Sequence, residues 1–374
     1  MILLTGGGTG GHIFPLLAVA RELQKQAVDK KIDLELRYYG PRTIYNDYFK
    51  QAGIAIKNIA GAKLRRYFSP QNFVDVPKLF WSILQSLWKV YWFMPDAAFS
   101  KGGPGALPVL LACWFYRVPI FIHESDTVPG LTNQISGRWA KKVFLGWEST
   151  KKFFPKKNTE VVGVPLREEI LSRLNLDIFG AKESFGFNIK EPVVLILGGS
   201  QGAQRINDFI LANLEIFIAK FQILHQVGSA NYETHVNNFD QLYGQWPKEL
   251  RERYKIFAFF EKNLADAYAA ADLVVSRAGA SAIFEIAAFG KPAILIPLPE
   301  AANDHQKINA YEYAQTGAAI VMEEANFLAN VVLGQIEKVL NNPDVRQKTS
   351  ITAKGFAKPK AAEIIGQFIL SKVL

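Results

Sequence analysis

Short apolar runs alternate with helix-like stretches along the whole chain. Strands are expected near residues 1–5, 33–39, 97–100, 118–122, 143–145 and 159–162, and again at 193–197, 221–225, 255–257, 273–275 and 293–296. Strands that alternate with helices form parallel sheets covered on both faces. The two series meet near residues 162–165, and a length of 374 residues suits two domains. We therefore predict an α/β architecture with two doubly wound parallel-sheet domains.

The first expected strand runs directly into a glycine loop and a histidine. Residues 6–11 are glycines interrupted only by Thr9, and His12 follows them. A strand, a loop without side chains and a helix start leave backbone N–H groups free to bind a diphosphate or a developing oxyanion. His12 stands where a general base would act, although a tight turn with a capping histidine explains the pattern equally well. The glycine spacing is not G-x-G-x-x-G, which disfavours a dinucleotide site.

Comparable loops follow other expected strands, at the strand ends where parallel sheets bind ligands. They comprise residues 101–105, 123–133, 198–202, 276–285 and 294–310. Ser200 can donate a hydrogen bond to a phosphate, and Glu285 can accept bonds from the vicinal hydroxyls of a ribose. His305 and Gln306 are candidates for sugar hydroxyls. Each loop alone is also explained as a turn or a helix cap, and Glu285 as a dipole partner, but together they predict one cleft lined by both domains.

The composition excludes several classes of protein. Cys113 is the single cysteine, so no intramolecular disulfide framework is possible. The amino terminus has no basic segment or cleavage site of a signal peptide. The longest apolar stretch, residues 79–94, is interrupted by polar residues and is shorter than the ~20 residues of a spanning helix. The five histidines show no metal-ligand spacing and no Asp-x-Asp occurs, so we expect helix N-termini and basic side chains, rather than a metal, to neutralise a diphosphate.

The basic charge is concentrated in the first half. Residues 1–164 contain 22 Lys and Arg against 11 Asp and Glu, whereas the remainder contains 21 against 23. A basic half indicates an anionic partner, and nucleic acid, acidic lipid and an acidic substrate are all open on charge alone.

A helical pattern over residues 78–94 carries the aromatic residues of this basic half. Wound as a helix, it puts a polar strip (Lys78, Ser82, Gln85, Ser86, Lys89) opposite an apolar set (Phe80, Ile83, Leu87, Val90, Met94), with Trp81, Trp88 and Trp92 at the border. Tryptophans flanked by lysines favour a membrane interface. Arg65 and Arg66 agree with an anionic membrane surface. The alternative is a helix that buries its aromatic residues in the core.

The segments GGTGGHIFP, HESD, PGLTN, GGSQGA, SRAGA and DHQ, in this order, resemble the motifs of the peptidoglycan N-acetylglucosaminyltransferases of glycosyltransferase family 28. The resemblance covers nearly the whole chain. It implies the GT-B fold, in which two Rossmann-like domains face a central cleft. Residues 1–164 would form the acceptor and membrane-associating domain, and residues 165–354 the domain that binds UDP-N-acetylglucosamine (UDP-GlcNAc). A C-terminal helix, about residues 355–374, would pack back on the first domain.

The resemblance also implies an activity and a location. The family transfers N-acetylglucosamine from UDP-GlcNAc to undecaprenyl-diphospho-N-acetylmuramoyl peptide (lipid I), giving lipid II. The expected partners are therefore UDP-GlcNAc, a polyprenyl-diphosphate-linked muramyl peptide and the anionic inner membrane surface, and not nucleic acid. The protein would be peripheral, at the cytoplasmic face of the cell membrane. Neither a cofactor nor a metal is expected.

We expect a direct, inverting displacement in which His12, or a nearby carboxylate such as Asp126, is the candidate general base. By the resemblance, the substrate site is expected to include Thr9, Gly10, Gly11, Asn133, Arg167, Ser200, Gln201, Asn207, Phe260, Ala280, Ser281, Ala282, Glu285, His305 and Gln306. Glu285 would bind the ribose and Gln306 would lie near the sugar. Backbone amides at 200–203 and 280–282, with Arg167, would stabilise the departing UDP.

The chain departs from the family pattern at four places. The usual HEQN is HESD, so the carboxylate of Asp126 replaces an amide. The usual threonine of the phosphate loop is Ala282, the usual Asn-Pro is Val164-Pro165, and the loop at 101–105 lacks the common tyrosine.

Three alternative functions are open on the sequence. A glycolipid glycosyltransferase with a diacylglycerol acceptor would share the donor domain and the basic, aromatic first domain. A nicotinamide-dependent dehydrogenase would need the G-x-G-x-x-G spacing that the first loop lacks. A non-catalytic membrane-surface binding protein would release no UDP with any acceptor.

Overall fold

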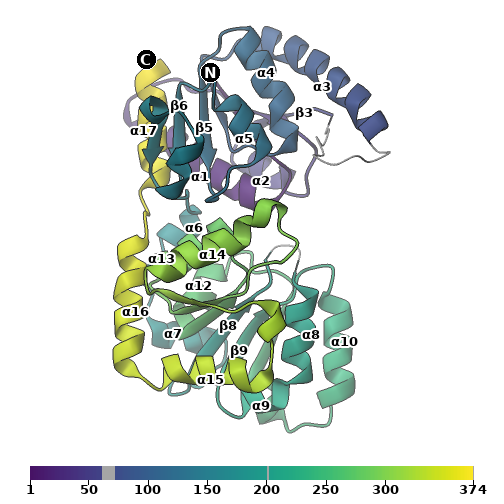
Figure 1. The fold of residues 1–374 in the computed structure, drawn as a ribbon, viewed down its shortest axis with the longest axis vertical. Coiled ribbons are helices and arrows are strands. Elements are labelled where there is room, and N and C mark those ends of the chain that lie inside the picture. The colour runs from purple at the N-terminus through teal and green to yellow at the C-terminus, as the bar shows by residue number, and fades with distance from the viewer. Residues whose placement is uncertain (61–71, 200–201, 374) are drawn as a thin grey trace. The chain divides into compact units, whose positions relative to one another are not determined.

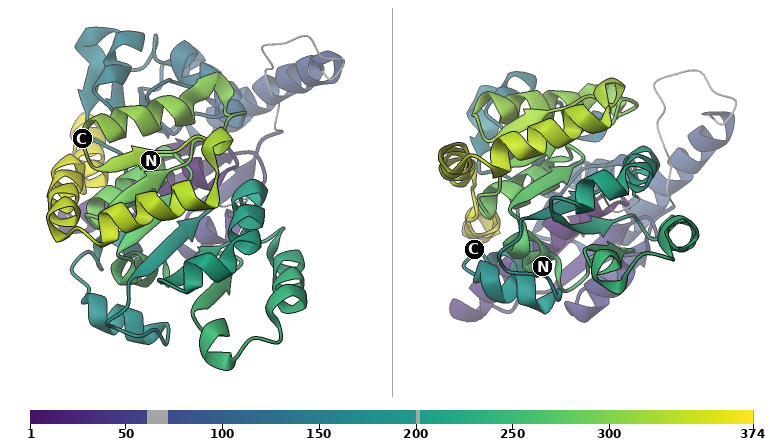
Figure 2. Two further views of the ribbon diagram at one scale, coloured as in Figure 1. Left: turned by 60° about the horizontal axis from the view of Figure 1, so that its bottom comes forward. Right: turned by 90° about the horizontal axis from the view of Figure 1, so that it is seen from below.

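A computed structural model describes residues 1–60, 72–199 and 202–373 and divides the chain into two compact units (Figure 1). The first unit comprises Met1–Arg167 and Lys358–Leu374, and the second comprises Glu168–Ala357. Each boundary lies a few residues beyond the position expected from the sequence. Both units consist of a parallel sheet with helices on its faces (Figure 2), as the alternating pattern predicts.

The first unit contains a seven-stranded sheet of order β3-β2-β1-β4-β5-β6-β7. Its elements are β1 (Ile2–Thr5), α1 (Gly10–Asp29), β2 (Leu36–Gly40), α2 (Asn46–Gln51), β3 (Ala55–Asn58), α3 (Asn72–Phe93), β4 (Ala97–Ser100), α4 (Leu107–Phe115), β5 (Ile120–Glu124), α5 (Leu131–Ser136), β6 (Lys142–Leu145), β7 (Thr159–Val161) and α17 (Ala361–Val373). In the register of β1, Ile2 pairs with Leu36 on one side and with Ala97 on the other.

Two apolar clusters, one on each face of this sheet, form the core of the first unit. Ile2 and Leu4 of β1 belong to the cluster that includes α1 and α17, whereas Leu3 belongs to the cluster that includes α4. This follows from the alternation of side chains along a strand. Because both faces are covered, all of β1 is buried, and its sequence reads as a continuous apolar run.

The C-terminal helix α17 packs against α1 in the first unit. Ile365, Ile369 and Leu370 join the core cluster of α1, and the ring of Phe368 lies edge-on to Phe121 at 5.9 Å. Gln26 of α1 donates a hydrogen bond to the Glu363 carbonyl at 3.1 Å. Through this helix the chain returns to its first unit after completing the second.

The second unit contains a six-stranded sheet of order β10-β9-β8-β11-β12-β13. Its elements are α6 (Glu168–Leu171), α7 (Ile178–Ser184), β8 (Val193–Leu197), α8 (Gln204–Ala212), α9 (Leu214–Ile218), β9 (Gln222–Gln226), α10 (Tyr232–Tyr243), α11 (Lys248–Arg251), β10 (Tyr254–Phe257), α12 (Leu264–Ala270), β11 (Leu273–Ser276), α13 (Ala280–Ala288), β12 (Ala293–Leu295), α14 (His305–Gln315), β13 (Ala319–Val321), α15 (Ala329–Leu340) and α16 (Pro343–Phe356).

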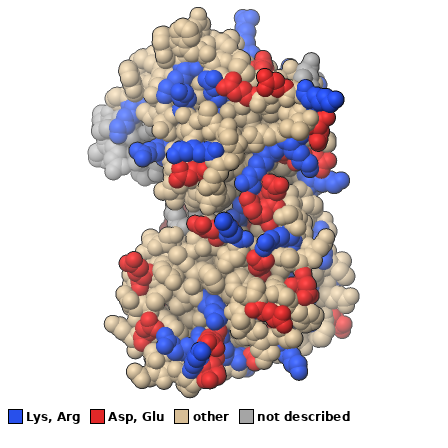
Figure 3. All heavy atoms as spheres, turned by 180° about the vertical axis from the view of Figure 1, so that it is seen from behind, with Lys and Arg blue, Asp and Glu red and all other residues tan. Residues whose placement is uncertain are grey.

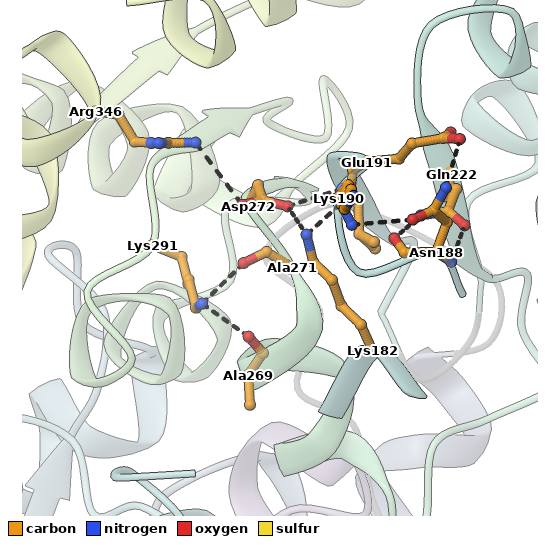
Figure 4. Close-up of polar contacts among 11 residues, drawn as sticks. Lys182, Asn188, Lys190, Glu191, Gln222, Ala269, Ala271, Asp272, Lys291 and Arg346 are labelled. Atoms are coloured by element: carbon orange, nitrogen blue, oxygen red, sulfur yellow. Dashed lines mark hydrogen bonds and ion pairs between the residues drawn. The ribbon is translucent and has the colours of Figure 1, made fainter. Parts of the chain in front are cut away.

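A buried ion pair connects the amino ends of β8 and β11 (Figure 4). Asp272 accepts a hydrogen bond from the Val193 amide at 2.9 Å and pairs with Lys182 Nζ at 2.8 Å. Lys182 also donates to the Glu191 carbonyl. Nearby, Lys291 donates to the last carbonyls of α12, and burial lowers its pKa to about 8. The glycine-rich loops follow the opposite, carboxyl ends of these strands.

Two strands of the structure are absent from the sequence-based prediction. β3 is an edge strand whose residues are mostly exposed, and the residues of β13 are all only half-buried. The mixed side chains of β3 give no apolar run of the kind that marks the central strands. β13 does lie in a short apolar run, residues 318–322, which the sequence-based prediction did not assign to a strand.

Candidate active site

The first glycine loop joins β1 to α1 and positions His12 in the first turn of the helix. Thr9 is the N-cap residue, and its carbonyl accepts hydrogen bonds from the amides of His12 and Ile13 at 3.0 Å. The Thr9 hydroxyl lies 2.8 Å from His12 Nδ1. When Nδ1–H donates to this hydroxyl, Nε2 keeps a lone pair, which is the arrangement that a general base requires. Gly11 is exposed and Gly10 is buried.

A second glycine loop, residues 101–105, packs directly on the first. Gly103 has φ +89°, and a Cβ on it would lie 2.7 Å from Gly7 Cα and 3.3 Å from His12 Nε2. Only glycine allows both this conformation and this approach. A Cβ on Gly102 would lie 2.5 Å from Asn133 Oδ1. The loop therefore fills the space between His12 and the start of α5, and leaves no room there for larger side chains.

The polar segment after β5 is organised by the buried carboxylate of Glu124. This side chain is 5% exposed and accepts hydrogen bonds from the amides of Asp126 and Gly130 at 3.1 Å and from Asn133 Nδ2 at 2.9 Å. Burial and the charge of Asp126 raise the pKa of Glu124, whereas Lys101 acts to lower it. Asp126 is half-buried, and Asn133 Oδ1 is buried with no hydrogen-bond partner among the described residues.

Sequence reasoning left Lys101 and Glu124 out of the site. Lys101 is 3% exposed, and its ammonium group lies 2.8 Å from His123 Nδ1 and donates to Ser125 Oγ. For Lys101, the available signal was a charged side chain at the end of the apolar strand β4. Arg167, also in the first unit, places its guanidinium 4.7 Å from the centre of the Phe14 ring.

In the second unit, the side chain of Gln226 at the end of β9 hydrogen-bonds to the glycine loop after β8. Gln226 donates to the Gly199 carbonyl at 3.1 Å and accepts from the Phe260 amide at 3.0 Å. Asn207 is completely buried and donates to the Val227 carbonyl at 2.9 Å. Asn207 and Phe260 are thus both buried, and the Phe260 ring packs against Phe257; direct contact of either residue with a substrate stays a prediction. Ser200 and Gln201 lie outside the described residues.

The loop after β11 ends in the N-terminus of α13. Gly279 is the N-cap residue with an extended conformation, and no side chain caps the helix. The first turn is formed by Ala280, Ser281 and Ala282, so its amides and the helix dipole suit an anion. Glu285, 8% exposed, accepts a hydrogen bond from the Tyr268 hydroxyl at 3.0 Å.

The loop after β11 takes part in an ion-pair network through Arg277. Arg277 is buried and pairs with Glu324 at 2.5 Å, and Arg205 pairs with the same carboxylate at 2.6 Å. Burial acts to raise the pKa of Glu324, but the bonds to the two arginines outweigh it and lower the pKa. His305 begins α14, and Gln306 accepts a hydrogen bond from the Leu298 amide at 3.1 Å.

The helix α3 turns its three tryptophans to the surface. Trp81, Trp88 and Trp92 are 64%, 66% and 69% exposed. The serines of the polar strip are instead buried: the Ser82 hydroxyl donates to the Ala60 carbonyl at 2.7 Å, and Ser86 donates to Ser82. Large exposed apolar residues of α3, α4 and their ends are Phe80, Trp81, Leu84, Trp88, Tyr91, Trp92, Met94, Trp114 and Phe115; we call them the exposed aromatic surface.

The three tryptophans of α3 are therefore not core-facing, whereas Phe93 at the end of the helix is 3% exposed and belongs to the core cluster that includes α4. Val90, placed with the apolar residues opposite the polar strip, is the one of that set that is fully buried. Arg65 and Arg66 lie outside the described residues. Figure 3 shows Lys and Arg side chains distributed over the first unit on the side drawn, beside smaller groups of Asp and Glu. No helix in residues 1–60, 72–199 and 202–373 has the length and apolarity of a membrane span.

Metal ligands do not gather in the described part of the chain: no group of three or more His, Cys, Asp or Glu side chains there could hold an ion.

Two doubly wound parallel sheets, each with glycine-rich loops at its carboxyl edge, define the chain as a GT-B-like α/β protein. Comparison with known proteins identifies the family. Residues 2–145 match the glycosyltransferase family 28 N-terminal domain, and residues 193–365 match the glycosyltransferase family 28 C-terminal domain. The chain belongs to glycosyltransferase family 28.

Relatives that match the chain over nearly its whole length share one enzyme name. The chain is 34% identical to a UDP-N-acetylglucosamine–N-acetylmuramyl-(pentapeptide) pyrophosphoryl-undecaprenol N-acetylglucosamine transferase of Bacillus cereus, over 98% of both chains. It is also 34% identical to the enzyme of that name from Legionella pneumophila, over 92% of this chain and 90% of the relative. The crystal structure of Acinetobacter baumannii MurG is similar, with a TM-score of 0.72, 27% identity and 99% coverage of both chains.

Proposed function

We propose that this protein transfers N-acetylglucosamine from UDP-GlcNAc to a polyprenyl-diphosphate-linked N-acetylmuramoyl peptide, as the names of its relatives describe. The observation that carries this proposal is 34% identity over 98% of both chains to the Bacillus cereus transferase. A likeness of that length includes both units and their loops. It also favours the muramyl-peptide acceptor over diacylglycerol, since the relatives are named for the former.

The donor site is proposed in the second unit. The amides of Ala280, Ser281 and Ala282 would bind the diphosphate, because they are the uncapped N–H groups at the start of α13. Glu285 would accept hydrogen bonds from the ribose hydroxyls, and its bond to Tyr268 orients the carboxylate for this purpose. Gln306 and His305 would contact the sugar, and Ser200 and Gln201 are further proposed donor contacts. Arg167, the last residue of the first unit before the chain enters the second, is proposed to contact the same donor.

The chemistry is proposed as a single inverting displacement. The C4 hydroxyl of the acceptor sugar attacks the anomeric carbon, the bond from that carbon to the UDP oxygen breaks, and the acceptor proton passes to His12 or Asp126. His12 is the better-oriented candidate, since the Thr9 hydroxyl fixes its ring. Asp126 is half-buried beside Glu124, and Thr9, Gly10 and Gly11 surround His12. Helix amides would stabilise the leaving diphosphate without a bound metal.

The location is proposed as peripheral, at the cytoplasmic face of the membrane. The exposed aromatic surface would enter the lipid interface, where tryptophans are favoured. The formal charge of residues 1–164, with 22 basic against 11 acidic residues, would add attraction to anionic lipid. An acceptor anchored in the bilayer requires the active site to work at such a surface.

The test is transfer of labelled N-acetylglucosamine from UDP-GlcNAc to lipid I, with diacylglycerol as the competing acceptor. We expect product with lipid I only. His12→Ala should lower kcat by roughly 10²–10⁴-fold, the usual contribution of a general base, while the affinity for UDP persists. Asp126→Asn tests the second candidate, and Asp47→Asn, an exposed carboxylate paired with Lys50, is the control.

Either of two results would contradict this scheme. Product with diacylglycerol and none with lipid I would assign the alternative acceptor. UDP binding without UDP release in the presence of any acceptor would make the protein a non-catalytic binding protein. If His12→Ala kept full kcat, the base would have to be sought at Asp126.

A further inference from the structure

Lys101 is a buried lysine that connects three strand ends beneath the candidate site. Its amide donates to the Thr5 carbonyl at the end of β1, at 3.0 Å. Its Nζ lies 2.8 Å from His123 Nδ1 at the end of β5 and also donates to Ser125 Oγ. The strands that it connects carry the loops of both candidate bases, His12 after β1 and Asp126 after β5.

The partners of Lys101 determine which group in this cluster carries the charge. His123 Nε2 lies 2.7 Å from the Gly163 carbonyl, which only accepts hydrogen bonds. Nε2 must therefore hold the imidazole proton, and Nδ1 offers its lone pair to Lys101. Burial, and then the neighbouring cation, hold the pKa of His123 well below its ordinary value. His123 is thus a neutral acceptor, and Lys101 is the cation.

Two carboxylates lie within the field of this one cation. Glu124 is 5% exposed and Asp126 is half-buried. Burial lowers the pKa of Lys101 to about 8, and Glu124 and Asp126 act to raise it. In return, Lys101 acts to lower the pKa of Glu124 against burial and against the charge of Asp126. The negative charges of Glu124 and Asp126 therefore repel each other and share the attraction of Lys101.

The same lysine is continuous with the contact between the two glycine loops. The next residues, Gly102 and Gly103, approach Asn133 and Gly7 too closely for any side chain. A displacement of Lys101 would move this contact and with it the surface on which the His12 ring rests. Lys101 thus positions the second glycine loop through its backbone, and it balances the charge of the neighbouring carboxylates through its ammonium group.

We propose that Lys101 is a positioning residue for the transfer reaction: its ammonium group fixes the segment His123 to Ser125 and compensates the buried charge of Glu124 beside Asp126. This rests on the proposed function. The opposing view is that Lys101 only stabilises the fold. The two differ in their pH dependence, because only a charge effect moves the titration of the site.

The test compares Lys101→Met, which removes the charge at similar size, with Lys101→Gln, which keeps N–H donors without charge. For both we expect the acidic limb of kcat/KM in lipid I transfer to rise by about one pH unit, because Glu124 loses the cation that acts to lower its pKa. At pH values below the limb, kcat/KM should therefore fall about tenfold, since one pKa unit corresponds to a factor of ten. The wild-type rate should decline above about pH 8, where Lys101 loses its proton, and this limb should be absent from both variants. The KM for UDP-GlcNAc should not change.

Two matched controls separate charge from contact. Ser125→Ala removes one acceptor and leaves the ammonium group, so both limbs should remain. Lys291→Met removes another buried lysine with a pKa of about 8, in the second unit, and should keep the limb near pH 8. Wild-type pH profiles in both Lys101 variants would overturn the proposal, as would an activity loss that is uniform with pH.

A readout independent of activity comes from nitrogen NMR of the full chain labelled at its five histidines, with His123→Gln for assignment. In the wild type, His123 Nδ1 should remain a hydrogen-bonded acceptor from pH 6 to 8, and in Lys101→Met its signal should move. An unchanged signal overturns the proposed contact. If the wild type transfers no sugar to any acceptor, the proposed function fails, and these spectra alone decide the contact of Lys101.

Discussion

Replacing Asp272 with asparagine tests how the second sheet is held at its amino edge. Asp272 and Lys182 are 12% and 5% exposed at their side chains and lie 2.8 Å apart. Asparagine keeps the size and can still accept from the Val193 amide, but Lys182 loses its counter-ion in a buried position. Breaking a buried pair in this way costs about 3–5 kcal/mol. Because Lys182 keeps its bond to the Glu191 carbonyl, we expect about 3 kcal/mol.

The assay is urea unfolding followed through Trp246, the only tryptophan of residues 168–357 among the seven of the chain. Labelling with fluorotryptophan lets NMR follow it separately. With a slope of roughly 2 kcal/mol per molar urea, the midpoint for the second unit should fall by about 1.5 M. Arg346→Ala is the control, since Arg346 lies 3.8 Å from Asp272 and is 44% exposed, and surface pairs contribute about 0–1 kcal/mol.

The double variant Lys182→Met with Asp272→Asn should recover most of the loss, because no unpaired buried charge remains. The kcat of the folded Asp272→Asn protein should stay at the wild-type value, since the pair joins the strand ends opposite to the candidate loops. A loss below about 1 kcal/mol for Asp272→Asn, or an equal loss for Arg346→Ala, would refute the argument that burial sets the strength of this pair.

Three further outcomes are expected. Transfer activity should persist in excess EDTA, and loss of activity that is restored by a divalent cation would contradict a metal-free donor site. Trp88→Ser with Trp92→Ser, at 66% and 69% exposed positions, should weaken binding to phosphatidylglycerol vesicles by roughly a hundredfold or more, at ~25 cal/mol per Å² of apolar surface withdrawn from water; Phe179→Ser, an exposed aromatic of the second unit, should not. Burial lowers the pKa of Lys101 and of Lys291 to about 8, below the ordinary ~10.4, so the unfolded chain binds more protons above pH 8. Thermal stability should thus rise between pH 8 and 9.5, and less so in Lys101→Met and in Lys291→Met; a fall that is the same in all three proteins would contradict it.

The parallel sheets were predictable because their central strands are buried on both faces. β1 and β8 are apolar at nearly every position and completely buried. Their continuous apolar runs therefore indicate central strands of a parallel sheet. The glycine loops were predictable for a related reason, since they follow those strands directly. Edge strands such as β3 carry no such signal, because solvent covers one side of them and their side chains are mixed.

The orientation of α3 could not be read from its sequence pattern. Hydroxyl groups normally indicate a surface position, yet Ser82 and Ser86 are buried because each donates a hydrogen bond to a backbone carbonyl within reach. With these small residues packed against the first unit, Trp88 and Trp92 are left facing outward. The assignment of Val90 to the face opposite Ser82 and Ser86 was wrong, because all three are buried on one face, four residues apart. Which face is inside depends on hydrogen bonds that only the fold supplies.

Lys101 illustrates a limit of another kind. Its role depends on His123, on Ser125 and, through the imidazole, on the Gly163 carbonyl, and these groups come together only when β4 pairs with β5. A lysine at the end of an apolar strand is in conflict with its surroundings unless a compensating group is near, because an unpaired buried charge is strongly unfavourable. That conflict is visible in the sequence, and the two acidic residues of HESD are visible as well. The sequence does not show that β4 and β5 are neighbouring strands, and it is this pairing that places the cation beside the two acidic residues. The charge balance of the site is therefore a property of the sheet rather than of any single motif.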